Sequence, residues 1–506
     1  MKKLLTVLFA ISILLACSMP AFAYESKLSG SYLVNAFVAD LALYDGSNKK
    51  PDRLVEQRFK FKYTGIVSEY IDFTYVGEIN QEWGEGGSSG GRRSGGAAGA
   101  SAVSLENKNL YACLAIPGTS WKSTVGYQTM GDNTDGFVFG DYYDGIRFRG
   151  QAFNGTLDVG WARAFEGDTG RPYDTTKINE QDDVDMVTAQ YQGKKIGNLK
   201  PSLDLIYISN RRPQNTTSPS NTDLGVISIP ADAKENLFFI DPRIDYSFTP
   251  DTKLTSYLIY EFGDQSNLLS NGKDVNVSGY LLMGKIETKD SNWSLGAHVV
   301  YASADDNAYD GKQESIRTPY HQVYDHNQSF IGQPSNSIWL DTGLMIMAGS
   351  AMGGVYPGGP QSLGLAVYDG YLAGYGLTAA VINGSYVPAA LPKAYVKASV
   401  GSFSTNIDNR NLFAGAKEHD GKYLGSEAAL HIGYNPYSNL DLSLNFAYAW
   451  LGSFYNNTST GKSVYNTTDE SATSGVNITC SAPLYGDTKG DPDNPCMVAA
   501  RARVTF

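Results

Sequence analysis

A regular alternation of apolar residues with small or polar ones is the feature that most restricts how this chain can fold. From Leu440 to Trp450 every second residue is large and apolar, and the residues between them are small or polar. The same period of two recurs from Trp293 to Tyr301 and from Val498 to Phe506. Because successive side chains of a β-strand point to opposite faces, this pattern indicates strands with one apolar and one polar face.

The high content of glycine and tyrosine, 54 Gly and 34 Tyr in 506 residues, also favours many short strands joined by turns. The alternation predicts about eighteen strands, with ends accurate to roughly two to four residues. They are expected near 28–44, 52–66, 69–82, 107–116, 120–129, 144–152, 155–167, 183–193, 199–210, 236–248, 253–263, 275–288, 292–304, 366–383, 393–405, 426–435, 439–451 and 497–506.

The connections between these strands fall into two alternating classes. Each even-numbered strand is followed by a short turn, as at 67–68, 117–119 and 436–438. Most odd-numbered strands are followed by a longer polar segment, and the longest are 83–106, 168–182, 211–235, 305–365 and 452–496. A membrane barrel sorts its connections in this way, with short periplasmic turns at one rim and long extracellular loops at the other.

The absence of any apolar run of 18 or more residues excludes helical membrane spans. In a bilayer every backbone polar group must be hydrogen-bonded internally, so strands can cross only as a closed sheet. The predicted fold is therefore an all-β, transmembrane, antiparallel up-and-down barrel of about 18 strands, in the range of roughly 16 to 20. The alternative is a secreted soluble β-protein that hides one face of all these strands in a core.

Residues 1–23 have the features of a secretory signal peptide. Two lysines precede the apolar stretch Leu4–Ala16, and Ala21–Ala23 matches a small-x-small cleavage site. Residues 24–506 are then expected to form a single barrel domain. An alternative is a lipoprotein signal, because Leu14–Cys17 approximates a lipobox.

The last six residues, Arg501–Phe506, alternate and end on an aromatic residue, as outer-membrane proteins of Gram-negative bacteria do. The stretch from Val125 to Ile146 places an acidic, glycine-rich loop between two strands. With these features the chain resembles the porins of metal-reducing delta-proteobacteria (OmpJ-type) and, more distantly, alginate-export channels. The resemblance implies a protein of the cell outer membrane, but it identifies no binding residue and no solute.

A barrel of eighteen strands is wide enough to leave an aqueous lumen. The polar member of each alternating pair is predicted to line this pore. One side is expected to be basic, with Arg58, Lys60, Lys62, Lys122, Arg147, Arg149, Arg501 and Arg503. The opposite side is expected to be acidic around Arg243, with Asp204, Asp241, Asp245 and Glu261. Opposed walls would set up a field across the pore. The alternative is that these charges only solvate the lumen.

The segment Gly131–Tyr143 is the third predicted external loop. General porins fold this loop inward, so the resemblance makes it the candidate constriction. Its candidate residues are Asp132, Asp135, Phe137, Phe139 and Asp141. The oxygen atoms of Asp132, Asn133 and Asp135 could also bind Ca²⁺, but a solvated turn is favoured because the spacing is not that of an EF-hand. No metal site is predicted.

Two other loops have an unusual composition. Residues 338–347 are too apolar for a free loop, so segment 305–365 is expected either to plug the lumen or to add a strand pair, giving twenty strands. Residues 84–99 are rich in Gly and Ser around Arg92 and Arg93, which indicates a flexible tether. The two arginines could contact lipopolysaccharide phosphates.

Three cysteines remain after removal of the signal peptide. Cys480 and Cys496 lie in a polar segment of an exported chain and form a candidate disulfide, whereas Cys113 lies in an apolar stretch as a lone thiol. No haem or zinc motif is present, and no cofactor is predicted. Loss of the two signal-peptide lysines changes the formal charge from -12 to -14, which argues against a nucleic-acid partner.

These observations predict a porin that lets small hydrophilic solutes or ions diffuse passively through a water-filled lumen. The expected partners are outer-membrane lipid, lipopolysaccharide and the solutes, and the sequence leaves open whether the barrel is a monomer or a homo-oligomer. The five histidines are scattered and no hydrolase or nucleotide motif is in a suitable context, so no enzyme is predicted. The alternatives are a structural barrel that scaffolds a cytochrome or surface assembly, and an exporter of anionic polysaccharide.

Overall fold

The computed structural model describes residues 25–40, 52–84, 105–165, 183–211, 234–266, 274–306, 311–316, 342–347, 374–408, 421–455 and 494–506. Within these residues nineteen strands form one sheet. They are β1 Glu25–Asp40, β2 Asp52–Ser68, β3 Ile71–Glu82, β4 Leu105–Ala115, β5 Lys122–Gly131, β6 Gly140–Ala152, β7 Gly155–Phe165, β8 Val184–Gly193, β9 Leu199–Asn210, β10 Lys234–Ser247, β11 Thr252–Ser266, β12 Val275–Lys289, β13 Trp293–Ala302, β14 Lys312–Gln313, β15 Leu377–Tyr386, β16 Ala394–Ser404, β17 Tyr423–Tyr437, β18 Leu440–Leu451 and β19 Cys496–Thr505.

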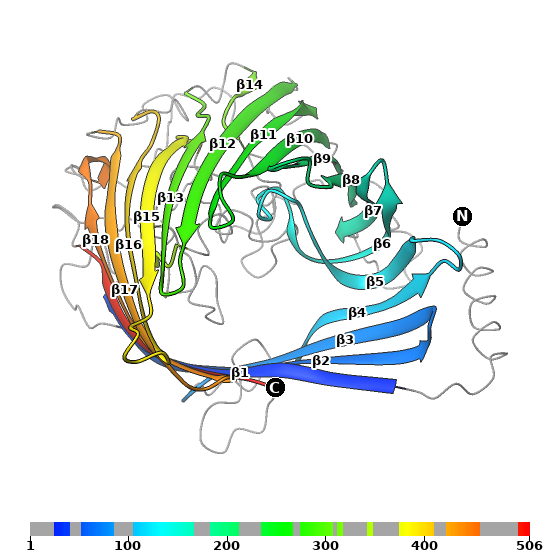
Figure 1. Ribbon diagram of the computed structural model, residues 1–506. Coiled ribbons are helices and arrows are strands. Elements are labelled where there is room, and N and C mark those ends of the chain that lie inside the picture. Colours follow the sequence, from blue (N-terminus) through cyan, green and yellow to red (C-terminus); the bar gives the residue numbers. More distant parts are fainter. Residues whose placement is uncertain are drawn as a thin grey trace.

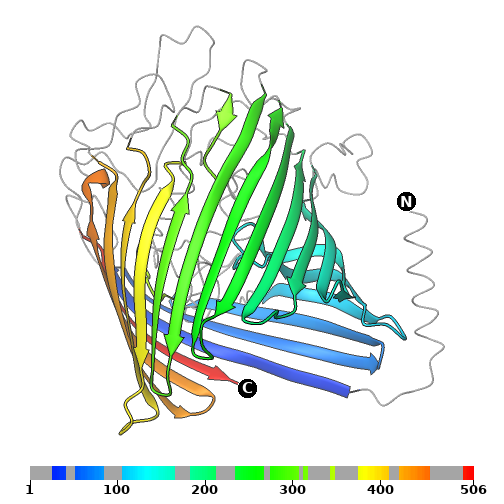
Figure 2. The same ribbon diagram turned by 45° about the horizontal axis from the view of Figure 1, so that its top comes forward.

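The sheet closes on itself, because β1 pairs with β2 on one side and with β19 on the other. The two-residue strand β14 lies parallel to β12, and the other eighteen strands form an antiparallel ring in chain order. Figure 1 shows the strands following one another around this ring, and Figure 2 shows their tilt. The predicted eighteen-stranded closed barrel is therefore confirmed.

The chain ends on the seam of the barrel. The backbone of Phe506 donates to and accepts from the backbone of Gly30, with N···O distances of 3.0 and 2.9 Å. Its ring stacks on Phe59 with centroids 5.9 Å apart. A side chain at Gly30 would collide with that ring, since an added Cβ would lie 2.6 Å from its Cζ atom. The glycine thus allows the terminal aromatic residue to cover the joint between β1 and β2.

The outer face of the barrel is apolar. On β18 the outward residues Leu444 and Trp450 are both 49% exposed, whereas the inward residues Ala447 and Ala449 are buried. The same alternation places large apolar side chains on the outside of the other long strands. This face has the character of a lipid-contacting surface. No helix in the described part of the chain is long and apolar enough to cross a membrane.

The predicted strand boundaries agree with the structure to within four residues, apart from the segment expected at 366–383. Its strand, β15, begins only at Leu377, and 366–373 lie outside the described residues. The signal peptide 1–23, most of the glycine-rich tether and Cys480 also lie outside them. Cys496 begins β19. Because Cys480 is outside the described residues, the disulfide between the two cysteines stays a prediction.

Part of the barrel interior is filled by one apolar cluster. Inward side chains of the wall, such as Ile208 and Phe239, pack there with two segments that enter from the loops, 132–139 and 342–347. The long segment 305–365 therefore contributes residues to the inside of the barrel. Its described residues include no strand except β14, so the alternative of an added strand pair finds no support among them.

Candidate constriction and lumen lining

The hairpin of β5 and β6 leaves the barrel wall before it ends. β5 pairs with β4 only as far as Tyr127, and β6 pairs with β7 only from Asp144 onward. The two strands nevertheless pair with each other up to Gly131 and Gly140. Residues 128–143, here called the tip hairpin, thus have no wall strand beside them within the described residues.

This arrangement corrects the limits of the predicted constriction loop. The loop proper is 132–139, and Asp141 lies in β6 opposite Met130. The strand continues inward because Phe137 and Phe139 bury their rings completely in the apolar cluster and carry the hairpin with them. The sequence around Asp141 lacks a clear period of two, so this extension could not be predicted locally.

Asp132 organises the loop from within. Its carboxylate accepts hydrogen bonds from the backbone N–H groups of Thr134, Gly136, Val138 and Phe139 at 2.7–2.9 Å, and from the Thr134 hydroxyl at 2.9 Å. Burial raises the pKa of Asp132, and these hydrogen bonds oppose that rise. The carboxylate is therefore engaged with its own loop. It holds the loop in one shape, which differs from the solvated turn expected from the sequence.

One side of the tip hairpin docks on the inner face of β8 and β9. The backbone N–H and the side-chain amide of Asn133 both donate to Asp204, and the Gln192 side chain donates to the Asn133 side chain. Gln190 donates to the Gly131 carbonyl at 3.0 Å. Asp204 is fully buried by this contact.

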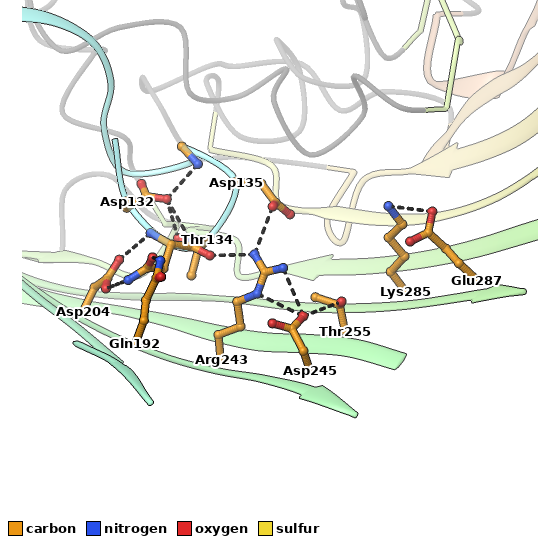
Figure 3. A network of polar contacts seen from close by, with 12 residues as sticks. Asp132, Thr134, Asp135, Gln192, Asp204, Arg243, Asp245, Thr255, Lys285 and Glu287 are labelled. Carbon is orange, nitrogen blue, oxygen red and sulfur yellow. Dashed lines mark hydrogen bonds and ion pairs between the residues drawn. The ribbon is translucent and has the colours of Figure 1, made fainter. Parts of the chain in front are cut away.

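Arg243 of β10 provides a second docking point. Its guanidinium donates to the Asn133 carbonyl at 2.6 Å and to Asp135 at 3.0 Å. On its other edge it pairs with Asp245 at 3.1 Å, and Asp245 also accepts from the Thr255 hydroxyl at 2.7 Å. Figure 3 shows Arg243 between the loop and the wall, joining Asp135 to Asp245. The positive charge of Arg243 is therefore engaged by Asp135 of the loop and Asp245 of the wall.

The other side of the tip hairpin reaches the inner face of β2 and β4. Lys60 donates to the Tyr142 hydroxyl at 3.1 Å, and the Lys108 ammonium lies 5.5 Å from the centre of the Tyr142 ring. Thr129 donates to the Asn109 side chain at 3.2 Å. The tip hairpin therefore contacts two parts of the wall, one on each side of its own strands.

The predicted basic residues divide into neutralised and open groups. Arg58 and Lys60 lie 3.5 and 3.9 Å from the buried carboxylate of Glu78. Arg147 forms an ion pair with Asp158. These cations compensate nearby carboxylates, which reduces the field that they present to a solute.

Four of the predicted pore-lining cations form no ion pair with any described residue. They are the exposed side chains of Lys62, Lys122, Arg149 and Arg503, all in the periplasmic half of the barrel. Arg501 is partly buried beside them, near the pair formed by Tyr395 and Asp441, whose hydrogen bond measures 2.7 Å.

The expected contrast between a basic and an acidic wall is wrong. Lys200, Lys253 and Lys397 occupy inward positions on β9, β11 and β16, so exposed cations are not confined to one side. Asp204, Asp241 and Glu261 are each 0% exposed. Asp241 and Asp204 are cross-strand neighbours beneath the docked tip hairpin. Because the filled interior covers these carboxylates, they do not line open water. Exposed cations instead lie on several sides of the periplasmic half.

Asp241 is unusual among these buried carboxylates. Neither of its oxygens has a hydrogen-bond partner among the described residues, and Asp132, Asp204 and Glu261 lie within electrostatic range. A buried acceptor without partners is destabilising, and nearby like charges add to the cost. We therefore expect Asp241→Asn to stabilise the folded barrel by about 1–3 kcal/mol, measured by urea unfolding in detergent at pH 7.

The matched variant for that measurement is Asp245→Asn. Asp245 accepts hydrogen bonds from both Arg243 and Thr255, so the same chemical change should lower stability there. Equal losses of stability in the two variants would contradict the account of Asp241 as a buried carboxyl group without hydrogen-bond partners among the described residues.

Several residues of the site were not predicted from the sequence. Glu78 and Lys108 lie at inward positions of β3 and β4, and Tyr142 reaches both Lys60 and Lys108 from the tip hairpin. The period of two was the available signal for the inward orientation of Glu78, and Glu427 in β17 is inward by the same period. No three His, Cys, Asp or Glu side chains in the described ranges are arranged to hold a metal ion.

No protein-family model and no curated protein matches the chain. Among solved structures, similar chains include outer membrane protein OpdK and OccK8 (OprE) of Pseudomonas aeruginosa, and OccAB2 of Acinetobacter baumannii. Their TM-scores are 0.46, 0.48 and 0.47 at 9%, 11% and 12% sequence identity. The alignments cover 95% of this chain in each case, and 99%, 98% and 98% of the other chains. The similarity assigns no residue role and no solute.

Proposed function

We propose that this protein is an outer-membrane porin through which small hydrophilic solutes or ions diffuse passively. The observation that carries the proposal is a closed ring of eighteen strands with an apolar outer face and exposed cations on its inner face. A ring of this size encloses more space than its wall side chains can fill. The inward segments narrow that space, and the exposed lysines and arginines indicate that its periplasmic half is open to water.

The charge distribution favours small anions among the permeating solutes. Lys62, Lys122, Arg149 and Arg503 face the lumen without ion-pair partners among the described residues. Fixed positive charge inside a narrow aqueous pathway raises the local concentration of anions. The resemblance to porins of metal-reducing delta-proteobacteria stays part of this proposal, as do contacts with lipopolysaccharide, an oligomeric state and the absence of catalysis.

The purified protein in a planar bilayer should show stable conductance steps, because an open lumen conducts at any voltage that the bilayer withstands. In asymmetric KCl the reversal potential should indicate a preference for chloride. A barrel that inserts and never conducts would overturn the porin proposal and favour the structural scaffold. Block of the current by anionic oligosaccharides at low concentration would instead favour the exporter of anionic polysaccharide.

A further inference from the structure

We propose that Glu427 is a positioning residue that holds segment 342–347 against β16 and β17, where the segment forms a second constriction of the lumen. This inference deepens the proposed porin function and rests on it. The tip hairpin docks on β8–β10, whereas segment 342–347 docks on a different part of the wall. The lumen is thus narrowed from two directions.

The Glu427 carboxylate binds the backbone of segment 342–347 through hydrogen bonds. It accepts hydrogen bonds from the N–H groups of Met345, Ile346 and Met347, at 3.0 Å for Ile346 and 2.7 Å for Met347. Hydrogen bonds to an ionised acceptor are stronger than those between neutral groups, and successive backbone N–H groups form a concavity suited to an anion. The fully buried Glu427 therefore satisfies three donors that would otherwise lie inside an apolar cluster.

Two further contacts fix the start of the segment. The Ser399 hydroxyl donates to the Thr342 carbonyl, and the His431 Nε2 atom lies 2.9 Å from the Gly343 carbonyl oxygen. Gly343 has φ of +77°, and a Cβ there would lie 2.7 Å from the His431 ring. Glycine at this position allows the backbone to approach β17 closely enough for Glu427 to reach the next residues.

The Glu427 side chain is not needed to close the barrel. The backbone of β17 pairs with β16 and β18 on either side, and Glu427 itself stands opposite Gly401 and Ala449. Its carboxylate points inward to the segment instead. Loss of the carboxylate should therefore release segment 342–347 while the wall stays closed.

The test compares Glu427→Gln with Glu427→Asp. The amide replaces one acceptor oxygen by a donor group that opposes the backbone N–H groups, whereas aspartate keeps the carboxylate on a shorter chain. We expect single-channel conductance to rise about twofold or more in Glu427→Gln, and to stay close to the wild-type value in Glu427→Asp. Glu287→Gln is the matched control, because Glu287 also faces inward but pairs with Lys285 at 3.0 Å and is half-exposed.

A second measurement reports the segment without relying on conduction. Met347→Cys is introduced where Cys113, Cys480 and Cys496 have been replaced by Ser, and labelling with a bulky, membrane-impermeant maleimide is timed. Met347 is fully buried, so labelling should be slow, and adding Glu427→Gln should accelerate it about tenfold or more. Ser399→Ala, which keeps the charge and removes one anchor, should give a smaller acceleration. Heat-modifiable migration on gels verifies that each barrel is folded.

The outcomes separate this inference from the porin proposal. Faster labelling together with higher conductance supports both. Another outcome is a wild-type barrel that does not conduct and a Glu427→Gln variant that is labelled faster and does conduct. This outcome would support the second constriction and overturn passive diffusion through the wild-type protein. Unchanged labelling in Glu427→Gln would overturn the role of Glu427, and faster labelling at unchanged conductance would overturn the second constriction.

Discussion

Replacing loop 132–139 by the dipeptide Asn-Gly should raise the single-channel conductance roughly two- to fivefold, since conductance follows the open cross-section of a pore. Gly131 and Gly140 are cross-strand partners, so a two-residue turn can join them without disturbing the hairpin. The change removes Asn133, which docks on Asp204, and Phe137 and Phe139, which fill the apolar cluster. The expected gain is large because these contacts hold the tip hairpin across the lumen.

A milder variant and a control define what the loop contributes. Asp132→Asn keeps the loop length but weakens the acceptor for four backbone N–H groups, so it should give a smaller rise and a noisier current. Shortening the exposed turn 388–393 between β15 and β16 changes the periplasmic rim and should leave the conductance unchanged. Wild-type conductance in the loop-shortened barrel would show that the tip hairpin does not limit the pore.

Neutralising the four open cations Lys62, Lys122, Arg149 and Arg503 to Gln should lower the chloride-to-potassium permeability ratio by about twofold or more. These side chains are exposed to the lumen and form no ion pair with described residues, so their field is not cancelled locally. The measurement is the reversal potential in asymmetric KCl, repeated at several salt concentrations. The effect should shrink at high salt, because screening shortens the range of each charge.

Two comparison sets show which charges matter. Changing Arg58, Lys60 and Arg147 to Gln should shift the ratio less, because these cations already compensate Glu78 and Asp158. Lys194, Lys195 and Lys393 lie in the periplasmic turns, and changing these three lysines to Gln lowers the positive charge outside the lumen by three. A shift as large in the turn set as in the lumen set would remove the four open cations from the explanation of selectivity.

The barrel itself could be predicted from the sequence because its cause is local. Alternation such as that from Leu440 to Trp450 sets which side chains face lipid, and the sorting of short and long connections sets the orientation of the strands. Strand pairing then follows chain order, so neighbours in the ring are neighbours in sequence. The one substantial deviation inside the described chain, the inward extension of β6 to Gly140, occurs where the local period is weak.

The candidate site was only partly predictable, because inward orientation does not determine what a side chain meets. Arg58 and Lys62 belong to the same face of β2, yet Arg58 is compensated by Glu78 and Lys62 is open. Asp241 was expected to line water and is instead sealed in a filled interior. Glu427 gave no sign in the sequence that it would hold residues 345–347, which lie about eighty positions away along the chain.

The sequence by itself determined that this chain forms a closed sheet with a lipid-type exterior, because the period of two and the need to satisfy every backbone polar group leave no other arrangement in a bilayer. Only the tertiary structure decided which lumen charges are open and which segments fill the interior. Those properties depend on where the tip hairpin and segment 342–347 fold back, and that is set by contacts with strands distant in sequence, such as β9, β10 and β17.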